Sequence, residues 1–147
     1  MIDMALYLKY RPQKLSELDS ESLRIRLNNV LTSSYTPHAL LFAGPKGTGK
    51  TSAARIVAKI LNCEQRIKKG GKFIEPCNNC ETCISITAGR NLDVLEIDAA
   101  SNRGIDEIRQ LRENIKLSPI SARFKIYIID EAHMLTNEAF NALLKTL

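Results

Sequence analysis

The sequence predicts an α/β fold in which helices flank a parallel β-sheet. Short apolar runs of strand length alternate along the chain with segments of helical periodicity. A glycine-rich phosphate-binding motif follows one apolar run, and two acidic residues end another. Strands that alternate with helices pair in parallel through right-handed crossovers. The chain has 147 residues, of which 44% are hydrophobic and 25% are charged, so we expect one soluble core domain over residues 1–147.

The N-terminal part of the chain is predicted to form an arm and a helix. Residues 5–16 are polar and contain Tyr10, Arg11 and Pro12, so we expect an extended arm ahead of the core. Residues 19–33 fit an amphipathic helix, because apolar residues recur on one face. The residues on that face are Leu23, Leu27, Val30 and Leu31.

A phosphate-binding motif occupies residues 44–51, which read G-P-K-G-T-G-K-T and fit the pattern G-x-x-x-x-G-K-T. Residues 39–43 before it predict a buried strand, and residues 52–61 after it predict a helix. Glycines let backbone N–H groups converge on phosphate oxygens, and the helix N-terminus adds partial positive charge. Lys50 would reach the β- and γ-phosphates, while the Thr51 hydroxyl would ligate Mg²⁺.

The flanking elements favour a site for a nucleoside triphosphate over a chance match in a loop. Its candidate residues are Gly44, Pro45, Lys46, Gly47, Thr48, Gly49, Lys50, Thr51 and Ser52.

The second half of the chain continues the alternation of strand and helix. Residues 93–98 and 125–129 are predicted strands, and apolar positions spaced three and four residues apart predict a helix over residues 105–117. Residues 137–147 begin another helix, with no glycine, proline or polar tail to close it. We therefore expect the sequence to be truncated at its C-terminus.

Residues 126–129 are apolar and lead directly into Asp130 and Glu131. This Walker B pattern supplies the acidic partner that a phosphate loop needs at the end of a neighbouring strand. We expect Asp130 to hold Mg²⁺ and Glu131 to orient and deprotonate the attacking water. Two solvated acids at a strand end are the alternative, which the phosphate loop argues against. Lys50 and Glu131 are the candidate catalytic residues.

All four cysteines lie within residues 63–90, directly after the phosphate-loop helix. Cys63, Cys77, Cys80 and Cys83 have the spacing C-x13-C-x2-C-x2-C. Two close C-x2-C steps bring thiolates together on a turn, and the distant cysteine can complete a tetrahedron around Zn²⁺. Disulfides are not expected in a cytoplasmic chain, and scattered free thiols are the alternative. We predict a closed, structural zinc site with a floppy glycine-rich loop between Cys63 and Cys77.

Charge and hydropathy narrow the class of protein only in part. The chain has 21 lysines and arginines against 16 acidic residues, and the resulting charge of +5 suits a nucleotide or nucleic-acid partner. A mildly basic soluble domain without such a partner has the same charge. No apolar run reaches the ~18 residues of a membrane span, and the first residues are unlike a signal peptide. We therefore expect a cytoplasmic protein.

Together these motifs resemble the N-terminal AAA+ ATPase domain of the gamma/tau subunits of bacterial DNA polymerase III, which belong to the sliding-clamp loader. The resemblance covers essentially the whole chain, and its markers include the phosphate loop with Thr51 and the four-cysteine insertion after the phosphate-loop helix, which together with the flanking strings narrows the match to this family. The other markers are residues 8–12 (L-K-Y-R-P), 96–101 (E-I-D-A-A-S), 129–135 (I-D-E-A-H-M-L) and 141–147 (N-A-L-L-K-T-L).

The resemblance implies an AAA+ motor subunit that hydrolyses ATP and loads the sliding clamp onto primed DNA. It implies ATP, Mg²⁺ and Zn²⁺ as cofactors, and other clamp-loader subunits in a ring-like hetero-oligomer as partners. It places Tyr7, Arg11 and Pro12 near the adenine ring, Lys50 at the phosphates, Thr51 and Asp130 at magnesium, and Glu131 at the attacking water.

Two features depart from the family pattern. The gap between Cys63 and Cys77 is longer than in the family, so Cys63 is the ligand that most needs a structural test. Family members also continue into sensor motifs, an arginine-finger segment and a helical lid. In the AAA+ strand order a later strand lies between residues 39–43 and residues 126–130, which would leave unpaired sheet edges here. We therefore expect weak stability or strand sharing with another copy, and little ATPase activity from residues 1–147 alone.

Two other functions remain open at this point. The first is a non-hydrolysing scaffold similar to the delta-prime subunit, which also carries zinc cysteines but typically has a degraded phosphate loop. The second is a helicase, because residues 130–133 read D-E-A-H. That match is short. A lone histidine after a strand, such as His133, is more often a helix-start or packing residue than a catalytic one.

Overall fold

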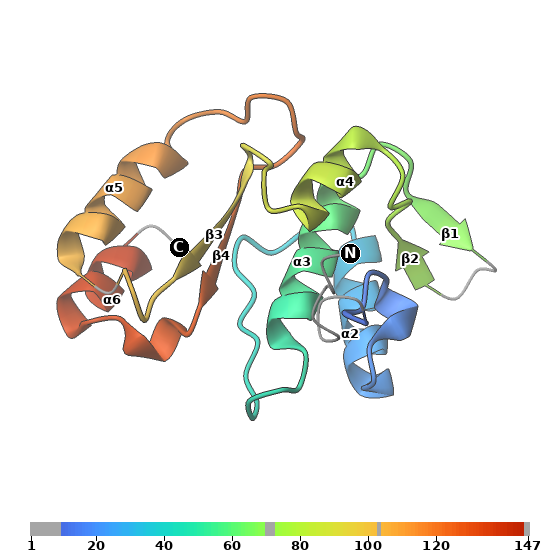
Figure 1. The fold of residues 1–147 in the computed structure, drawn as a ribbon, viewed down its shortest axis with the longest axis horizontal. Helices are drawn as coiled ribbons and strands as arrows, with labels where there is room; N and C mark the ends of the chain where they lie inside the picture. The colour runs from blue at the N-terminus through green and yellow to red at the C-terminus, as the bar shows by residue number, and fades with distance from the viewer. Residues whose placement is uncertain (1–9, 70–72, 103, 146–147) are drawn as a thin grey trace, which may run out of the picture.

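The computed structural model describes residues 10–69, 73–102 and 104–145. Figure 1 shows the elements in two groups, with α2, α3, α4, β1 and β2 in one and β3, β4, α5 and α6 in the other. In chain order they are η1 (Leu15–Glu17), α2 (Glu21–Thr32), α3 (Lys50–Asn62), β1 (Ile67–Lys69), β2 (Phe73–Glu75), α4 (Glu81–Thr87), β3 (Val94–Asp98), α5 (Ile105–Ile115), β4 (Ile126–Asp130), η2 (Ala132–Met134) and α6 (Asn137–Leu144).

The first group is held together by an apolar cluster between α2, α3 and β2. The Ser20 side chain caps α2 by accepting a hydrogen bond from the backbone N–H of Leu23, at 3.3 Å. The predicted helices over residues 19–33 and 52–61 are both confirmed within a few residues at their ends. The buried residues of this cluster are Leu15, Leu18, Leu27, Leu31, Ala53, Ile56, Val57, Ile60 and Ile74.

The second group is a parallel pair of strands covered by two helices. β3 pairs with β4 in a register that sets Val94 opposite Ile126 and Asp98 opposite Asp130. The predicted parallel pairing is therefore confirmed, and it brings the carboxyl ends of both strands to one edge of the sheet. Helices α5 and α6 pack on each other through the buried side chains of Ile108, Leu111, Ala139 and Leu143.

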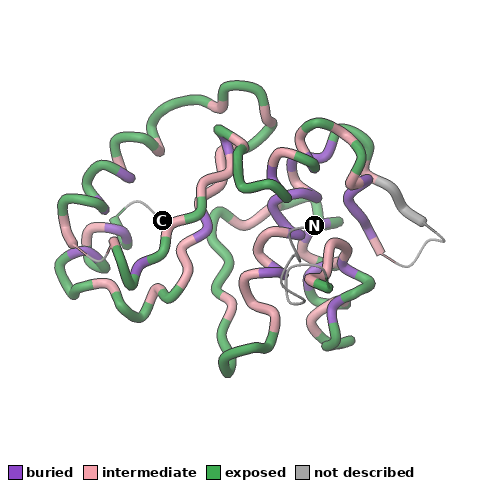
Figure 2. Tube along the Cα trace, viewed as in Figure 1, coloured by how far each residue is buried: buried purple, intermediate pink, exposed green. Residues whose placement is uncertain are grey.

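The prediction of a strand over residues 39–43 is wrong, because the structure has irregular backbone there. A strand requires a neighbour for its backbone hydrogen bonds, and among the described residues β3 and β4 pair only with each other. The apolar side chains of this run are also not buried, since 89% of Leu41 is exposed. In Figure 2 the segment that enters the phosphate loop is coloured mainly as exposed.

The prediction of a floppy loop between Cys63 and Cys77 is also wrong for the described residues on either side of residues 70–72, which themselves lie outside the described chain. Strands β1 and β2 form an antiparallel hairpin there, with Ile67 opposite Glu75 and Lys69 opposite Phe73. The hairpin returns the chain toward the end of α3, so that a long sequence gap spans a short distance in space. Within the described chain, no helix is long and apolar enough to cross a membrane.

Candidate functional site

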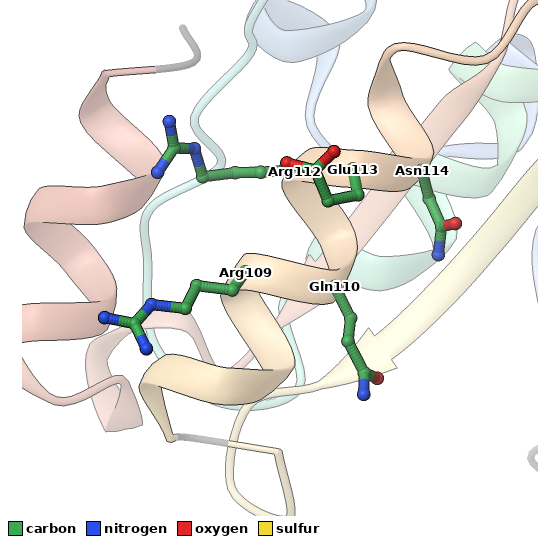
Figure 3. A pocket seen from close by; sticks show the side chains of 5 residues that line it. All are labelled: Arg109, Gln110, Arg112, Glu113 and Asn114. Atoms are coloured by element: carbon green, nitrogen blue, oxygen red, sulfur yellow. The ribbon is translucent and has the colours of Figure 1, made fainter.

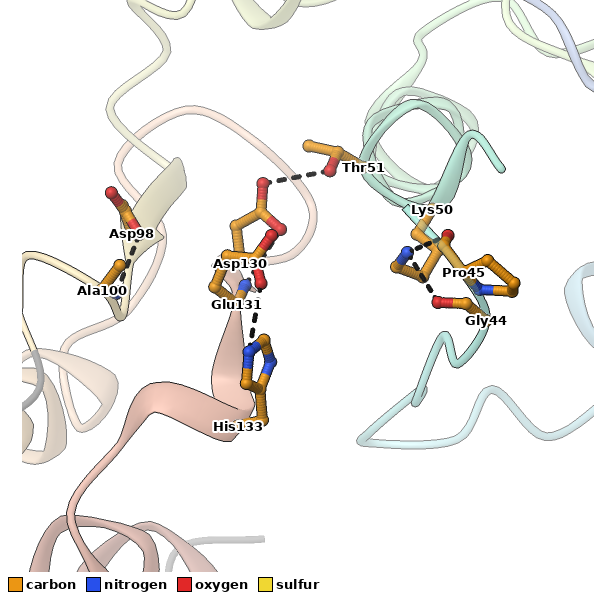
Figure 4. Close-up of polar contacts among 9 residues, drawn as sticks. All are labelled: Gly44, Pro45, Lys50, Thr51, Asp98, Ala100, Asp130, Glu131 and His133. Atoms are coloured by element: carbon orange, nitrogen blue, oxygen red, sulfur yellow. Dashed lines mark hydrogen bonds and ion pairs between the residues drawn. The ribbon is translucent and has the colours of Figure 1, made fainter. Parts of the chain in front are cut away.

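The phosphate loop connects residues 39–43 to the N-terminus of α3. Gly47 and Gly49 have φ angles of 84° and 80°, in the left-handed region that glycine adopts at little cost. The Lys50 ammonium donates hydrogen bonds to the carbonyl oxygens of Gly44 at 2.9 Å and Pro45 at 2.7 Å. These contacts fold the lysine over the loop (Figure 4), where its charge and the first N–H groups of α3 attract an anion.

A hydrogen bond joins the phosphate loop to the acidic end of β4. The Thr51 hydroxyl donates to Oδ2 of Asp130 at 3.0 Å, although the two residues are 79 positions apart. Figure 4 shows Thr51 at the start of α3 with its hydroxyl directed at the Asp130 carboxylate. A hydroxyl and a carboxylate in contact are the pair of oxygen ligands that Mg²⁺ takes in phosphate-loop proteins. The two predicted magnesium ligands are therefore brought together.

Glu131 follows β4 in a left-handed conformation, with φ 52° and ψ 40°. This conformation is strained for a residue with a side chain, and such strain concentrates at functional sites. The Glu131 carboxylate lies 3.4 Å from Nε2 of His133, and both side chains are largely exposed. His133 lies in η2, as expected for a residue that starts a helical turn.

Two further connections of α3, one to β3 and one to the segment just before β4, were not predicted from the sequence. Arg55 forms a two-pronged ion pair with Glu96, with both N···O distances at 2.7 Å. The buried Asn62 side chain exchanges two hydrogen bonds of 2.9 Å with the backbone of Phe124. Together with Thr51, these residues fix the helix against the sheet at several points along its length. A charged residue within an apolar strand is the only sequence signal that could have indicated Glu96.

The four cysteines form one cluster, and their Sγ atoms all lie within 4.8 Å of one another. Cys63 follows the last residue of α3, Cys77 and Cys80 bound the turn after β2, and Cys83 lies in α4. No disulfide joins them. The prediction that all four come together is confirmed, including the distant Cys63.

The backbone around the cluster suits thiolate ligands. Backbone N–H groups donate to sulfur from Cys77 to Cys63 at 3.3 Å, and from Cys80 to Cys77 at 3.2 Å. Burial would raise the pKa of the Cys77 thiol, but hydrogen bonds from Asn79, Cys80 and Cys63 lower it to about 7. Burial raises the pKa of both Cys63 and Cys83. Four sulfur donors with this support fit a tetrahedral metal such as Zn²⁺, whose charge would hold the thiols deprotonated.

The predicted adenine-binding arm is described only in part. Tyr7 lies outside the described residues, while Arg11 and Pro12 precede η1 and are half-buried. The backbone carbonyl of Arg11 accepts a hydrogen bond of 3.2 Å from the Gln13 side chain. The hydrogen bonds of residues 13–16 with other parts of the described chain lead to α2, to α3 and to residues 63–90.

A shallow hollow also lies along one face of α5 (Figure 3). Its polar side chains extend from a single helix and include none of the predicted site residues. They are Arg109, Gln110, Arg112, Glu113 and Asn114. The hollow is therefore separate from the phosphate loop and from the cysteine cluster.

The fold and the site together define an α/β protein that carries a phosphate-loop motif and a four-cysteine cluster. A family model described as "DNA polymerase III, delta subunit" matches residues 20–147, and the chain belongs to this family. Its relatives include the DNA polymerase III subunit tau of Bacillus subtilis, which is 51% identical over 144 residues. That alignment covers 97% of this chain and 25% of the relative.

Two other relatives have comparable similarity. The DNA polymerase III subunit gamma/tau of Mycobacterium tuberculosis is 46% identical over 145 residues, which are 97% of this chain and 24% of the relative. The DNA polymerase III subunit tau of Escherichia coli is 45% identical over 140 residues, or 95% of this chain and 21% of the relative. The chain thus spans about a quarter of the length of the relatives that it matches.

Proposed function

We propose that this chain is the ATP-binding and ATP-hydrolysing part of a motor subunit of the bacterial replicative clamp loader. In this proposal residues 1–147 are part of an AAA+ core, and residues 63–90 are a zinc-binding insertion in it. The motor loads the sliding clamp onto primed DNA within the DNA polymerase III holoenzyme in the cytoplasm. The names and identities of the tau and gamma/tau relatives support the assignment to this assembly.

The observation that carries the proposal is the 3.0 Å hydrogen bond between the Thr51 hydroxyl and the Asp130 carboxylate. It supports a single magnesium–nucleotide site built from a helix N-terminus and a strand end. If the phosphate loop and the acidic strand end had separate roles, neither role would require contact between the Thr51 hydroxyl and the Asp130 carboxylate.

The residues of the site divide the chemistry between them. The loop N–H groups and Lys50 bind the phosphates, while Thr51 and Asp130 hold Mg²⁺, which supplies charge neutralisation when it is bound. Glu131 orients the attacking water and accepts its proton. An arginine from a neighbouring subunit supplies further positive charge in the transition state. Arg11 and Pro12, with Tyr7, contact the adenine ring.

The zinc site in this proposal is structural, because four cysteines fill the coordination sphere and leave no position for water. Its partners are the other subunits of a ring-like hetero-oligomer, together with the clamp and primed DNA. We expect residues 1–147 alone to be nearly inactive, since residues 39–43 have no strand partner within the described chain.

The test is steady-state ATP hydrolysis by the full-length protein in its assembled complex, with and without the clamp and primer–template DNA. Strong stimulation by clamp and DNA together is the expected result. Binding of ATP without turnover under every condition would overturn the motor assignment.

The same experiment tests a second function, a non-hydrolysing scaffold similar to the delta-prime subunit. The description of the matching family as a delta subunit favours this alternative. The intact pairs of Lys50 with Thr51 and Asp130 with Glu131 weigh against it, because a scaffold has no need of them.

A further inference from the structure

The described part of the N-terminal arm, residues 10–16, is anchored on the four-cysteine segment, residues 63–90, by a buried carboxylate. Glu75 ends β2, two residues before Cys77, and only 6% of it is exposed. Its two oxygens accept hydrogen bonds from the backbone N–H groups of Leu15 at 2.7 Å and Ser16 at 2.9 Å. A buried carboxylate needs such donors, and the N–H groups at the start of η1 have no partner within that short helix. The contact therefore supplies hydrogen-bond donors to the Glu75 carboxylate and an acceptor to each of the two N–H groups.

A second anchor lies beside the first and is formed by Lys59 of α3. Only 1% of Lys59 is exposed, and its ammonium donates to three oxygens within hydrogen-bonding distance. These are the Gln13 carbonyl at 3.0 Å, the Gln13 side-chain Oε1 at 2.6 Å and the Asn78 side-chain Oδ1 at 2.8 Å. The Asn78 amide also donates to the Gln13 carbonyl at 3.3 Å. The Lys59 ammonium of α3 thus links the arm to the four-cysteine segment.

Asn78 links this network to the metal-binding turn. It lies between Cys77 and Cys80 with a φ angle of 59°, a left-handed conformation that asparagine tolerates better than most residues. The turn is shaped by N–H groups that point at sulfur, since Asn79 and Cys80 both donate to the Cys77 Sγ at 3.4 Å and 3.2 Å. The position of the Asn78 side chain therefore depends on the same turn that presents the thiols.

The network also reaches the arm residues that lie closer to the N-terminus. The Gln13 side-chain amide donates to the Arg11 carbonyl at 3.2 Å, while its oxygen is held by Lys59. Thr87 of α4 donates to the same oxygen at 3.4 Å. Gln13 is thus fixed by the cysteine segment on one side and fixes the backbone of Arg11 on the other.

We propose that the four-cysteine segment is a platform that positions the N-terminal arm, with Asn78, Lys59 and Glu75 as the positioning residues. Metal binding orders the turn that carries Asn78, and the ordered turn holds Gln13 and the backbone of Arg11. Its consequence for nucleotide binding rests on the proposed function, in which Arg11 and Pro12 contact adenine. Metal loss then weakens binding at the adenine end and spares the phosphate end.

The anchoring is tested by hydrogen exchange at the backbone amides of Leu15 and Ser16 in the full-length protein. Asn78→Gly keeps the left-handed backbone and removes the side-chain amide, and Asn79→Gly is its matched control because the Asn79 side chain is exposed. Lys59→Met is a second variant, which keeps the apolar stem and removes the ammonium. Zinc content is measured for each protein.

We expect faster exchange at both amides in Asn78→Gly, in Lys59→Met and after removal of metal by a chelator. In each case the rate should rise by about tenfold or more, and a factor of ten corresponds to about 1.4 kcal/mol. Asn79→Gly should exchange like the unaltered protein. Unchanged protection of Leu15 and Ser16 in both variants and after chelation would overturn the proposal.

The consequence for the nucleotide is tested with two probes, ATP and inorganic triphosphate. Asn78→Gly should weaken ATP binding by about tenfold and leave triphosphate binding unchanged, because only ATP uses the arm. Equal affinity of variant and unaltered protein for ATP, with exchange accelerated, would overturn the adenine part of the proposal. Failure of the unaltered protein to bind ATP would overturn the proposed function instead, and the exchange result would still decide the anchoring.

Discussion

The Thr51 hydroxyl donates a hydrogen bond of 3.0 Å to Asp130 Oδ2, and this contact joins the phosphate loop to the end of β4, 79 positions further along the chain. The second oxygen of Asp130 accepts the backbone N–H of Glu131 at 2.9 Å. The aspartate is therefore oriented from both sides, with one oxygen toward α3 and the other toward the residue proposed to activate water.

The first prediction concerns the hydroxyl of Thr51. Thr51→Val keeps the shape of the side chain and removes the donor, so one oxygen of Asp130 loses its partner. We expect turnover by the full-length complex to fall roughly 10²-fold, in line with loss of one preorganised polar group at a reacting phosphate. Thr51→Ser is the matched control and should keep most of the activity. A loss of turnover in Thr51→Ser as large as that in Thr51→Val would contradict a specific role of the hydroxyl.

The second prediction separates the catalytic role of Glu131 from its backbone strain. Glu131→Gln should retain ATP binding and lose turnover by about 10²- to 10⁴-fold, because the general base is removed while the shape is kept. Binding is measured by equilibrium titration and turnover by phosphate release. A parallel loss of both would assign Glu131 to nucleotide binding.

The strain itself is tested with glycine and alanine at the same position. Glu131 has a φ angle of 52°. Glu131→Gly should therefore have a higher free energy of unfolding than Glu131→Ala, by about 1 kcal/mol, as measured by denaturant titration. Neither variant should hydrolyse ATP. Equal stability of the two would show that the surrounding chain accommodates a side chain here without cost.

The sequence predicted the parts of the fold that have a strong local pattern. Helix α3 and the pair β3–β4 have long apolar periodicity or clear strand composition, and they were placed within a few residues. The hairpin β1–β2 and helix α4 were missed, because strands of three residues and a helix of seven are too short for a periodic signal. Residues 39–43 show the opposite error, since an apolar composition cannot reveal whether a partner strand is present.

The site was predictable where spacing alone determines chemistry. The phosphate loop is continuous in sequence, and Cys77, Cys80 and Cys83 are close together, so their residue types could suggest a use. The contacts of Glu75 with Leu15 and of Lys59 with Gln13 join residues 60 and 46 positions apart. Such contacts depend on how the hairpin and helices pack, and a single sequence carries no local signal for them.

The third prediction concerns a buried carboxylate outside the site. Burial would raise the pKa of Asp93, but the backbone N–H groups of Ile120, Ser121 and Ala122, with the Ser121 hydroxyl, lower it below its ordinary value of 3.8. Because the folded-state pKa lies below the unfolded one, the charged carboxylate stabilises the fold at pH values above about 4. This stabilisation is lost as the pH falls further, through the folded-state pKa.

Asp93→Asn should therefore lower the free energy of unfolding at pH 7 by about 2–3 kcal/mol, because an amide cannot accept as many hydrogen bonds and carries no charge. The difference from the unaltered protein should shrink as the pH falls below 4. Denaturant titrations at several pH values measure both the loss of stability at pH 7 and its dependence on pH. A difference that does not depend on pH would show that Asp93 acts through packing and not through its charge.

The fourth prediction concerns the distant member of the cysteine cluster. Cys63 lies at the end of α3 and its sulfur accepts the Cys77 N–H at 3.3 Å, so Cys63→Ser removes one of four donors and opens the cluster. We expect the variant to lose bound zinc during purification. We also expect Cys77 and Cys80 to react with an alkylating reagent, because they lie on the turn that the metal would hold. Zinc content and mass spectrometry of the alkylated protein measure the two effects.

In the unaltered protein a chelator should produce the same alkylation pattern. Retention of one zinc per chain by Cys63→Ser would exclude Cys63 from the ligand set and leave a site of three cysteines.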